Sequence, residues 1–396
     1  MQKGKKFVSG NEAVALGTLL SRPHVIAAYP ITPQTVAVER LSEMVEEGEL
    51  KSEFMHVESE HSALSACMGA SSIGARTFTA TSSQGLLYMA ECMHYASGGR
   101  FPIVMMNANR SVALPWNIYG DQRDSLSLLD SGWIQVYVED AQESLDMVIQ
   151  AYAIAENPKV LTPVMLNLDG FILTHTYELV DVPSSEEVDE FLPPFSTPFK
   201  MDLNEPKNMG FSSGPSDNME FKYQQHKAAM ASIEVIKDVD RKFRDRFGRG
   251  YGGMVDAYRC EDADLVLISL GSVTGTCRVV VDELREEGWK AGVLKIRFMR
   301  PFPEREIMEL AGRVKAIGVI DRDISFGYEG TVYTNVNSAL AKSRAGAFSL
   351  NFIAGLGGRD VSRQDIRNMF TRLKEGLEGQ TGEYVEFINL GVEVDG

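Results

Sequence analysis

The chain has few cysteines, and they are widely spaced. Its 396 residues include only four, at Cys67, Cys92, Cys260 and Cys277. No two of them form the CxxC spacing that redox and many metal sites use. Cluster-binding cysteines come in short runs, so the sequence predicts no iron–sulfur cluster bound by this chain alone. A disulfide framework is not expected in a chain of this size without a secretion signal.

The chain also lacks an excess of positive charge and any long apolar run. Its net charge is −16 and its pI is about 4.9, which argues against a nucleic-acid-binding protein. No apolar stretch is long enough to cross a bilayer, and no apolar segment of a signal peptide follows the basic residues 1–6. The sequence therefore predicts a cytoplasmic protein with neither a nucleic-acid nor a membrane partner.

Hydrophobic residues make up 44% of the chain, which suffices for the cores of two or three domains. Strand and helix patterns alternate over residues 8–170, which predicts a doubly wound, mostly parallel α/β sheet. Residues 10–20 read as its first helix, with Asn11 as the expected cap. A proline-rich, non-periodic stretch and then a second α/β pattern follow. The predicted parts are residues 1–182, an extended segment with a bridging helix at 183–260, and a smaller α/β domain at 261–396.

Several polar residues fall where predicted strands end, and ligands of parallel α/β sheets bind at the carboxyl ends of strands. These residues are Thr32, Glu60, Arg110 and Asp169. Each has an ordinary structural explanation when taken alone. Glu60 opens a helix of small residues, where a carboxylate is favoured by the helix dipole. Thr32 lies between two prolines, and Asp169 followed by Gly170 is typical of a simple turn.

Four motifs in order change this interpretation. They are YPITP at 29–33, ESEH at 58–61, TSSQG at 81–85 and NANR at 107–110. Together they resemble the α subunit of the 2-oxoacid:ferredoxin oxidoreductases, in particular the pyruvate:ferredoxin oxidoreductases (pyruvate synthases). Further similarity at 115–121, 300–303 and 355–360 extends the resemblance over nearly the whole chain.

The resemblance implies a thiamine diphosphate enzyme whose first domain is of the pyrimidine-binding type and whose second resembles the transketolase C-terminal domain. The family's conserved glutamate matches Glu60, which would hydrogen-bond the pyrimidine ring nitrogen and so promote formation of the reactive ylid. Thr32 and Arg110 match the substrate contacts, with Arg110 pairing the 2-oxoacid carboxylate. The residues implied in cofactor binding are Pro30, Glu60, Ser83, Gln84 and Gly85.

The chain lacks the motif that holds the other half of this cofactor. Thiamine diphosphate enzymes bind the diphosphate and Mg²⁺ through a GDG motif, and here only Gly120-Asp121-Gln122 is present. The resemblance therefore implies a β subunit that holds the diphosphate and Mg²⁺. It also implies a γ subunit and a ferredoxin-like δ subunit, with [4Fe-4S] clusters on partner subunits only. No metal site is expected on this chain.

The predicted function is that of an α subunit in a multi-subunit enzyme. The enzyme would catalyse the reversible, CoA-dependent oxidative decarboxylation of pyruvate to acetyl-CoA and CO₂, with reduction of ferredoxin. The alternative is the same reaction on branched-chain 2-oxoacids such as 2-oxoisovalerate, because those α subunits share the motifs. A chain of a lipoamide-linked 2-oxoacid dehydrogenase and a non-catalytic scaffold subunit are weaker alternatives, since YPITP, Glu60 and Arg110 are all present.

Overall fold

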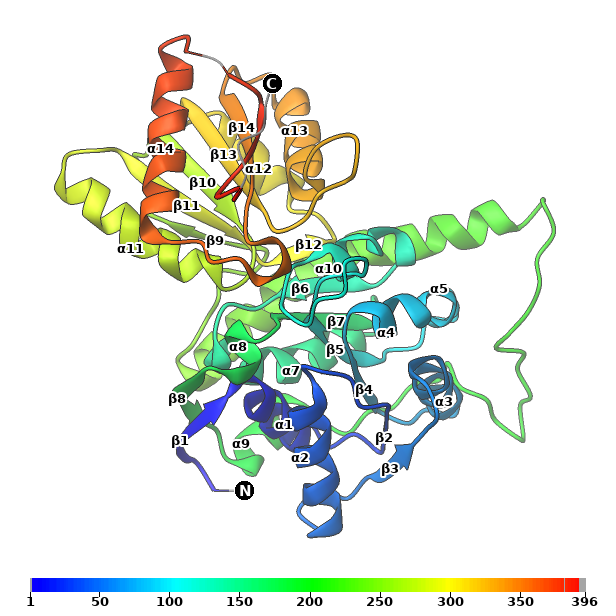
Figure 1. Cartoon of the computed structure of the whole chain (residues 1–396). Coiled ribbons are helices and arrows are strands. Elements are labelled where there is room, and N and C mark those ends of the chain that lie inside the picture. Colours follow the sequence, from blue (N-terminus) through cyan, green and yellow to red (C-terminus); the bar gives the residue numbers. More distant parts are fainter. Residues whose placement is uncertain (1, 381, 392–396) are drawn as a thin grey trace.

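The chain folds into two helix-covered sheets, which lie one above the other in Figure 1. The computed structural model describes residues 2–380 and 382–391. The first sheet has seven strands in the order β12-β6-β7-β5-β4-β2-β3, all parallel except β12. From one edge to the other they are β12 (Phe298–Arg300), β6 (Ile134–Tyr137), β7 (Val164–Asp169), β5 (Val104–Asn109), β4 (Thr77–Thr81), β2 (Val25–Ala28) and β3 (Glu53–His56).

Alternating side chains of these strands build two separate apolar cores, since successive residues of a strand point to opposite faces. Along β5, Val104 and Met106 enter the core beneath one set of helices, and Met105 enters the other. Helices α1 (Gly10–Ser21), α2 (Thr35–Glu46) and α7 (Ala141–Ala155) cover the first face, and α3 (Glu60–Ser72), α4 (Ser83–Tyr88) and α5 (Ala90–Gly98) cover the second.

Short elements complete the first domain at its edges. A separate antiparallel ribbon is formed by β1 (Gly4–Ser9) and β8 (Tyr177–Val182). The remaining pieces are α6 (Arg123–Leu126), a 3₁₀ turn (Leu129–Ser131), α8 (Ile172–His175) and α9 (Ser185–Phe191).

The second sheet has six strands, parallel except for its edge strand β9. In order they are β15 (Val385–Phe387), β14 (Phe348–Ile353), β13 (Ala316–Asp321), β10 (Leu265–Ser269), β11 (Ala291–Ile296) and β9 (Val255–Tyr258). Helices α11 (Val273–Glu286) and α14 (Arg363–Leu377) share one core with it, α12 (Glu304–Ala311) and α13 (Thr331–Ser343) share the other, and a 3₁₀ turn spans Leu356–Gly358.

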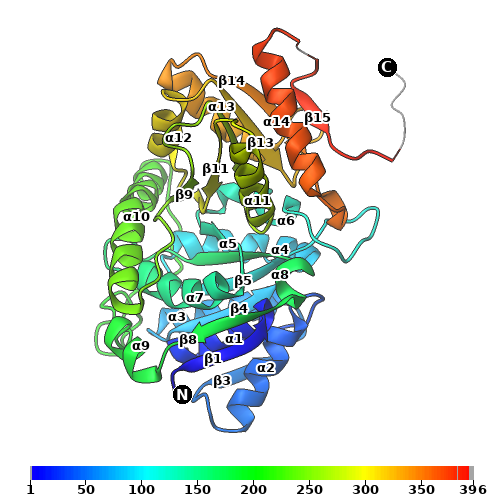
Figure 2. The same cartoon turned by 90° about the vertical axis from the view of Figure 1, so that its left-hand side faces the viewer.

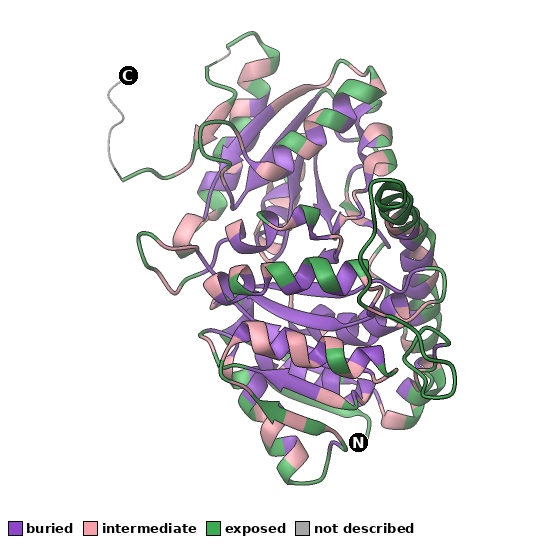
Figure 3. Cartoon of the chain, turned by 90° about the vertical axis from the view of Figure 1, so that its right-hand side faces the viewer, coloured by how far each residue is buried: buried purple, intermediate pink, exposed green. Residues whose placement is uncertain are grey.

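A long helix and an exposed arm connect the two halves. Figure 2 shows α10 (Asn218–Phe247) running along the side of the first domain toward the second. Its second half packs on the first core through Ile236 and Phe243, while its first half and residues 199–217 are largely exposed (Figure 3). The short strand β12 then joins the first sheet although it lies in the second half of the sequence, so the domains share backbone pairing.

The predicted fold class, α/β with doubly wound parallel sheets and a second, smaller domain, is confirmed. In the described part of the chain, no helix is both long enough and apolar enough to cross a membrane.

Candidate active site

The carboxyl ends of β2, β4 and β5 bring the predicted site residues to one edge of the first sheet. Thr32 follows β2, Ser83 follows β4 and Arg110 follows β5. Glu60 reaches the same edge as the first residue of α3, because Ser59 caps that helix by accepting a hydrogen bond from the Ser62 amide. Strand order places β4 between β2 and β5, so these residues surround one point.

The Glu60 carboxyl group lies against Gly85. A Cβ atom at position 85 would be 2.5 Å from Oε1 of Glu60 and 2.7 Å from Oγ1 of Thr81, so only glycine leaves room for the carboxyl group. Glu60 is 8% exposed, and no described residue donates a hydrogen bond to its carboxylate. A nearly buried acceptor without a donor is costly, which is the usual mark of a group kept for a ligand.

Arg110 is buried and points across the site. One guanidinium nitrogen, Nη1, donates to the backbone oxygen of Thr32 at 2.7 Å, and Nη2 donates to Oε1 of Gln84 at 3.3 Å. Its guanidinium carbon lies 5.9 Å from the ring centre of Trp116. Burial lowers the pKa of Arg110, and the nearby charges of Asp124 and Glu60 oppose that shift. The Nε atom is buried without a partner among the described residues.

The turn between β4 and α4 is held in an unusual conformation. Ser83 has a φ of 50°, in the left-handed region that non-glycine residues rarely adopt. Its hydroxyl lies 2.6 Å from Oε1 of Gln84 and 2.7 Å from the backbone oxygen of Ser111. Its amide donates to the Asp124 carboxylate at 3.1 Å. Such strain persists where surrounding contacts fix it, which is common at functional sites.

The YPITP turn is anchored by two side chains whose role the sequence did not reveal. Asn11 was expected to cap α1, but that prediction is wrong because Ser9 is the cap, in a capping box with Glu12. Asn11 is fully buried and donates instead to the backbone oxygen of Pro33 at 2.9 Å. Gln34 donates to the backbone oxygen of Tyr29 at 2.9 Å. The exposed Pro30 lies between these two anchor points.

The sequence context predicted a simple turn at Asp169, but the structure gives this residue another role. It ends β7, is 2% exposed, and joins the two domains. Its carboxylate accepts hydrogen bonds from the amide and hydroxyl of Ser272, at 2.7 and 2.5 Å, and lies 2.8 Å from Nη1 of Arg322. Asp169 lies opposite Asn109 in the sheet, next to the site, and its side chain belongs to the domain junction.

The polar atoms at the site fit a heteroaromatic group with polar edges. Near the Glu60 carboxyl group, buried atoms without a partner in the described chain include Oγ1 of Thr81, Oγ of Ser82 and Oε1 of Gln34. Gly85 provides the space beside them. Across residues 2–380 and 382–391, no group of three or more His, Cys, Asp or Glu side chains could hold a metal ion.

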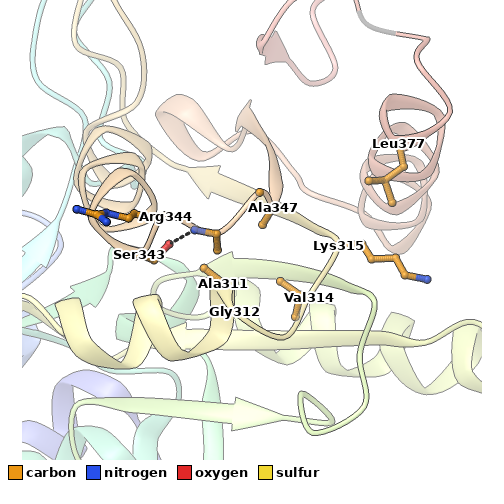
Figure 4. Close-up of a pocket in the computed structure, with 10 residues that line it drawn as sticks. Ala311, Gly312, Val314, Lys315, Ser343, Arg344, Ala347 and Leu377 are labelled. Carbon is orange, nitrogen blue, oxygen red and sulfur yellow. Dashed lines mark hydrogen bonds between the residues drawn. The ribbon is translucent and has the colours of Figure 1, made fainter.

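A surface hollow lies elsewhere in the described part of the molecule. About 730 Å³ in volume, it sits in the second domain between the ends of α12, α13 and α14 (Figure 4). Its lining includes Val314, Lys315, Ser343 and Arg344 but no carboxylate. A smaller hollow of about 390 Å³ lies beside Pro30 and is bordered by glutamates of α2. Acid–base chemistry is therefore better supported at the strand ends than in the larger hollow.

The chain matches two family models in sequence. Residues 17–241 match the thiamine-diphosphate-binding domain of pyruvate flavodoxin/ferredoxin oxidoreductase, and residues 263–366 match core domain II of pyruvate:ferredoxin oxidoreductase. The first domain is thus of the thiamine-diphosphate-binding class.

Relatives with established names are similar in sequence to this chain over nearly its full length. Pyruvate synthase subunit PorA of Methanothermobacter thermautotrophicus is 48% identical, over 93% of this chain and 94% of that protein. Ketoisovalerate oxidoreductase subunit VorA of Pyrococcus furiosus is 47% identical, over 98% of each. The chain belongs to the pyruvate flavodoxin/ferredoxin oxidoreductase family, which confirms the family and the oxidoreductase class predicted from its motifs.

A solved structure agrees in fold. The 2-oxoglutarate:ferredoxin oxidoreductase of Magnetococcus marinus, determined with 2-oxoglutarate, coenzyme A and succinyl-CoA bound, superimposes with a TM-score of 0.73. The match covers 95% of this chain and 66% of that one at 19% identity, a level at which the likeness concerns the fold alone.

Proposed function

We propose that this chain is the α subunit of a pyruvate synthase and carries the pyrimidine side of a thiamine diphosphate site. The observation that carries the proposal is the Glu60 carboxylate, which lies against Gly85 without a hydrogen-bond donor and within reach of the Arg110 charge. An acidic group and a guanidinium at one site suit a cofactor that needs a proton relay and a substrate that carries a carboxylate.

Some of the site residues contact the cofactor and others contact the substrate. Thiamine diphosphate, when bound, supplies the carbanion chemistry that breaks the bond between the carboxyl and keto carbons of a 2-oxoacid. Glu60 holds a proton at its carboxyl oxygen and shares it with a ring nitrogen of the cofactor. Arg110 pairs with the substrate carboxylate, and Thr32 hydrogen-bonds the carboxylate or keto oxygen. Pro30, Ser83, Gln84 and Gly85 shape the pocket for the ring.

The remaining parts of the proposal concern partners. The diphosphate and Mg²⁺ would be held by a β subunit, because this chain has no GDG motif. A γ subunit and a ferredoxin-like δ subunit carrying [4Fe-4S] clusters would complete the enzyme, with CoA and ferredoxin as co-substrates and the cytoplasm as its location. The division at residues 182 and 260 is part of the same proposal.

The substrate side chain has one serious alternative. The VorA relative is 47% identical and the PorA relative 48%, so identity does not separate 2-oxoisovalerate from pyruvate. Trp116 is the neighbour of Arg110 expected to influence this choice, because its largely exposed indole ring lies 5.9 Å from the guanidinium carbon.

The test is an assay of the native complex, purified through a tag on this chain. Pyruvate, 2-oxoisovalerate and 2-oxoglutarate are compared at equal concentrations with CoA and a viologen as electron acceptor. We expect the highest kcat/KM with pyruvate. A preference for 2-oxoisovalerate would support the alternative. Reduction of lipoamide in place of the viologen, or no turnover with any 2-oxoacid, would refute both.

A further inference from the structure

A single buried carboxylate connects the two loops that carry Gln84 and Arg110. Asp124, on the short helix α6, is fully buried. Its Oδ2 atom accepts hydrogen bonds from the amide of Ser83 and the amide of Arg110, each at 3.1 Å. One oxygen atom therefore links the turn after β4 with the residue that follows β5.

The other contacts of Asp124 make this link rigid. Oδ1 accepts from Nδ2 of Asn109 at 2.7 Å and from the amide of Ser125 at 2.7 Å, and Nδ2 of Asn107 lies 3.3 Å from Oδ2. Every partner is a donor, so both oxygen atoms act as acceptors only. An ionised carboxylate satisfies this arrangement, whereas a carboxamide in either orientation would turn an N–H group toward other N–H groups.

The hydrogen-bonded contacts of Asp124 extend to the guanidinium group of Arg110. Asp124 holds the Ser83 amide, the Ser83 hydroxyl lies 2.6 Å from Oε1 of Gln84, and the same oxygen accepts from Nη2 of Arg110. Asp124 thus contacts Arg110 directly at the backbone and indirectly at the tip of its side chain. The left-handed φ of Ser83 shows that this turn is held by its contacts and not by its own preference.

We propose that Asp124 is a positioning residue for 2-oxoacid binding, which fixes the Ser83–Gln84 turn and the Arg110 loop in one geometry and so aims the guanidinium at the substrate carboxylate. The inference rests on the proposed role of Arg110. Asp124 itself touches neither substrate nor cofactor, since it is fully buried beneath both loops. Bidentate recognition of a carboxylate depends on the direction of the guanidinium, so a loss of this alignment weakens substrate binding first.

The charged and titratable groups around Asp124 give the link a pH dependence. Burial is the main cause that raises the pKa of Asp124 to about 6, the nearby Asp121 adds to it, and the Asn109 and Arg110 hydrogen bonds oppose it. Arg110 and Tyr137 also face Asp124. Protonation removes an acceptor, so the alignment is complete well above pH 6, is half lost at about pH 6, and disappears as the pH falls further.

The test compares Asp124→Asn with the wild type in the assembled complex, using pyruvate, CoA and a viologen. We expect the KM for pyruvate to rise about tenfold or more, since hydrogen bonds to a charged group are lost, with a smaller change in kcat and an unchanged KM for CoA. In the wild type this KM should also rise as the pH falls below about 6, whereas in the variant it should be high at every pH.

Asp121→Asn is the matched control. Asp121 is equally buried and lies three residues away, but it contacts Arg123 and the amide of Gly357 and neither Ser83 nor Arg110. We expect its KM for pyruvate to stay within about twofold of the wild type, because no contact of Arg110 changes. If the Asp124 variant fails to assemble, the pH profile of the wild-type complex tests the inference, compared with that of the Asp121→Asn complex. A rise in the KM for pyruvate is expected in both as the pH falls below about 6, and a flat profile would overturn the inference.

Two other results would overturn the inference. One is an unchanged KM for pyruvate in the variant that assembles, together with a raised KM in Arg110→Ala. The other is an equal rise in the KM for pyruvate and for CoA, which would indicate a general structural defect. An unchanged KM in Arg110→Ala would instead refute the proposed substrate site, so the two failures are distinguishable.

Discussion

Glu60 and Glu143 are both buried glutamates in the first turn of a helix, yet their surroundings are opposite. Glu143, on α7, is 1% exposed and is paired with two cations of the second domain: Nζ of Lys295 and Nε of Arg297, the latter at 2.9 Å. Glu60 is 8% exposed and receives no hydrogen bond from the described residues. One carboxylate joins two domains, and the other is left with its acceptors unused.

The difference separates a structural site from the proposed functional one. Burial alone would raise the pKa of Glu143, but the charges of Lys295 and Arg297 outweigh it and lower that pKa to about 2. The junction also contains the contacts of Asp169 and a bidentate pair between Arg278 and Glu139 at 2.7 and 2.9 Å. The fold satisfies the charge of Glu143, whereas the unsatisfied Glu60 fits its proposed role as a ligand contact.

The largest effect is expected from Glu60→Gln. The amide cannot hold and share a proton at the position of the carboxyl oxygen, so pyruvate-dependent viologen reduction should fall about a thousandfold or more. The complex should still assemble, because Glu60 makes no hydrogen bond that the fold needs. Turnover is measured on the purified complex, and subunit composition by size-exclusion chromatography. Near-normal turnover would remove Glu60 from the chemistry.

A large loss of stability is expected from Glu143→Gln. The change removes the nearest carboxylate from two buried cations. Lys295 keeps only the longer pair with Glu139 at 3.4 Å, and Arg297 keeps only the pair with Asp240 at 3.6 Å. Breaking one partner of a buried ion pair typically costs about 3 kcal/mol in the free energy of unfolding. Urea unfolding of the purified chain should show a lower midpoint. The matched control is Glu309→Gln, which breaks an exposed pair with Arg305 and should leave the midpoint in place. Equal midpoints for wild type and Glu143→Gln would show that the junction is not stabilised by this charge.

Glu143 should also make the stability of the chain sensitive to strong acid. The pKa of Glu143 is about 2 in the folded chain, below the ordinary 4.5 of a glutamate. Its contribution is therefore fully present above about pH 4.5 and is lost as the pH falls toward 2. The contribution is on the order of 3 kcal/mol. Stability measured against pH should fall more steeply in the wild type than in Glu143→Gln over this window. Parallel curves would contradict the assignment.

The smallest of the four effects is expected from Arg110→Ala, which removes a charge from the substrate pocket and leaves the junction untouched. The apparent KM for pyruvate should rise about 10- to 100-fold through the loss of a charge-assisted pair, with a smaller change in kcat. Steady-state assays with pyruvate and with CoA distinguish the two substrates. A KM for pyruvate within twofold of the wild type would exclude Arg110 from carboxylate binding.

Much of the fold was predictable because its signals are local. The alternation of apolar strands with helices predicted parallel α/β sheets, and the four motifs predicted the family; both are confirmed. The site residues remain predictions, although the structure gathers Glu60, Gly85 and Arg110 at one edge of the sheet. Motif order was informative here because each motif lies at or just after the end of a strand, and parallel strands end at the same edge.

The roles of Asn11, Asp124 and Asp169 were not predictable from local sequence. Asn11 near a helix start is an ordinary cap, and Asp169 before a glycine is an ordinary turn residue. Their partners are 22 residues away in one case and 103 in the other. Asp124 lies in a polar run that has no periodicity, and its role depends on amides from two other strands' ends. Sequence spacing carries no information about such pairings.

The sequence by itself determined which segments form the strands and helices, the family, and the absence of a diphosphate motif. These features depend on residue types and spacing along the chain. Only the tertiary structure decided which buried carboxylates are satisfied. Glu60, Asp124, Glu143 and Asp169 are alike as residue types, and each lies near the end of a strand or the start of a helix. Donors from distant segments reach Asp124, Glu143 and Asp169 but not Glu60. This difference separates the proposed ligand contact from the carboxylates that hold the fold together.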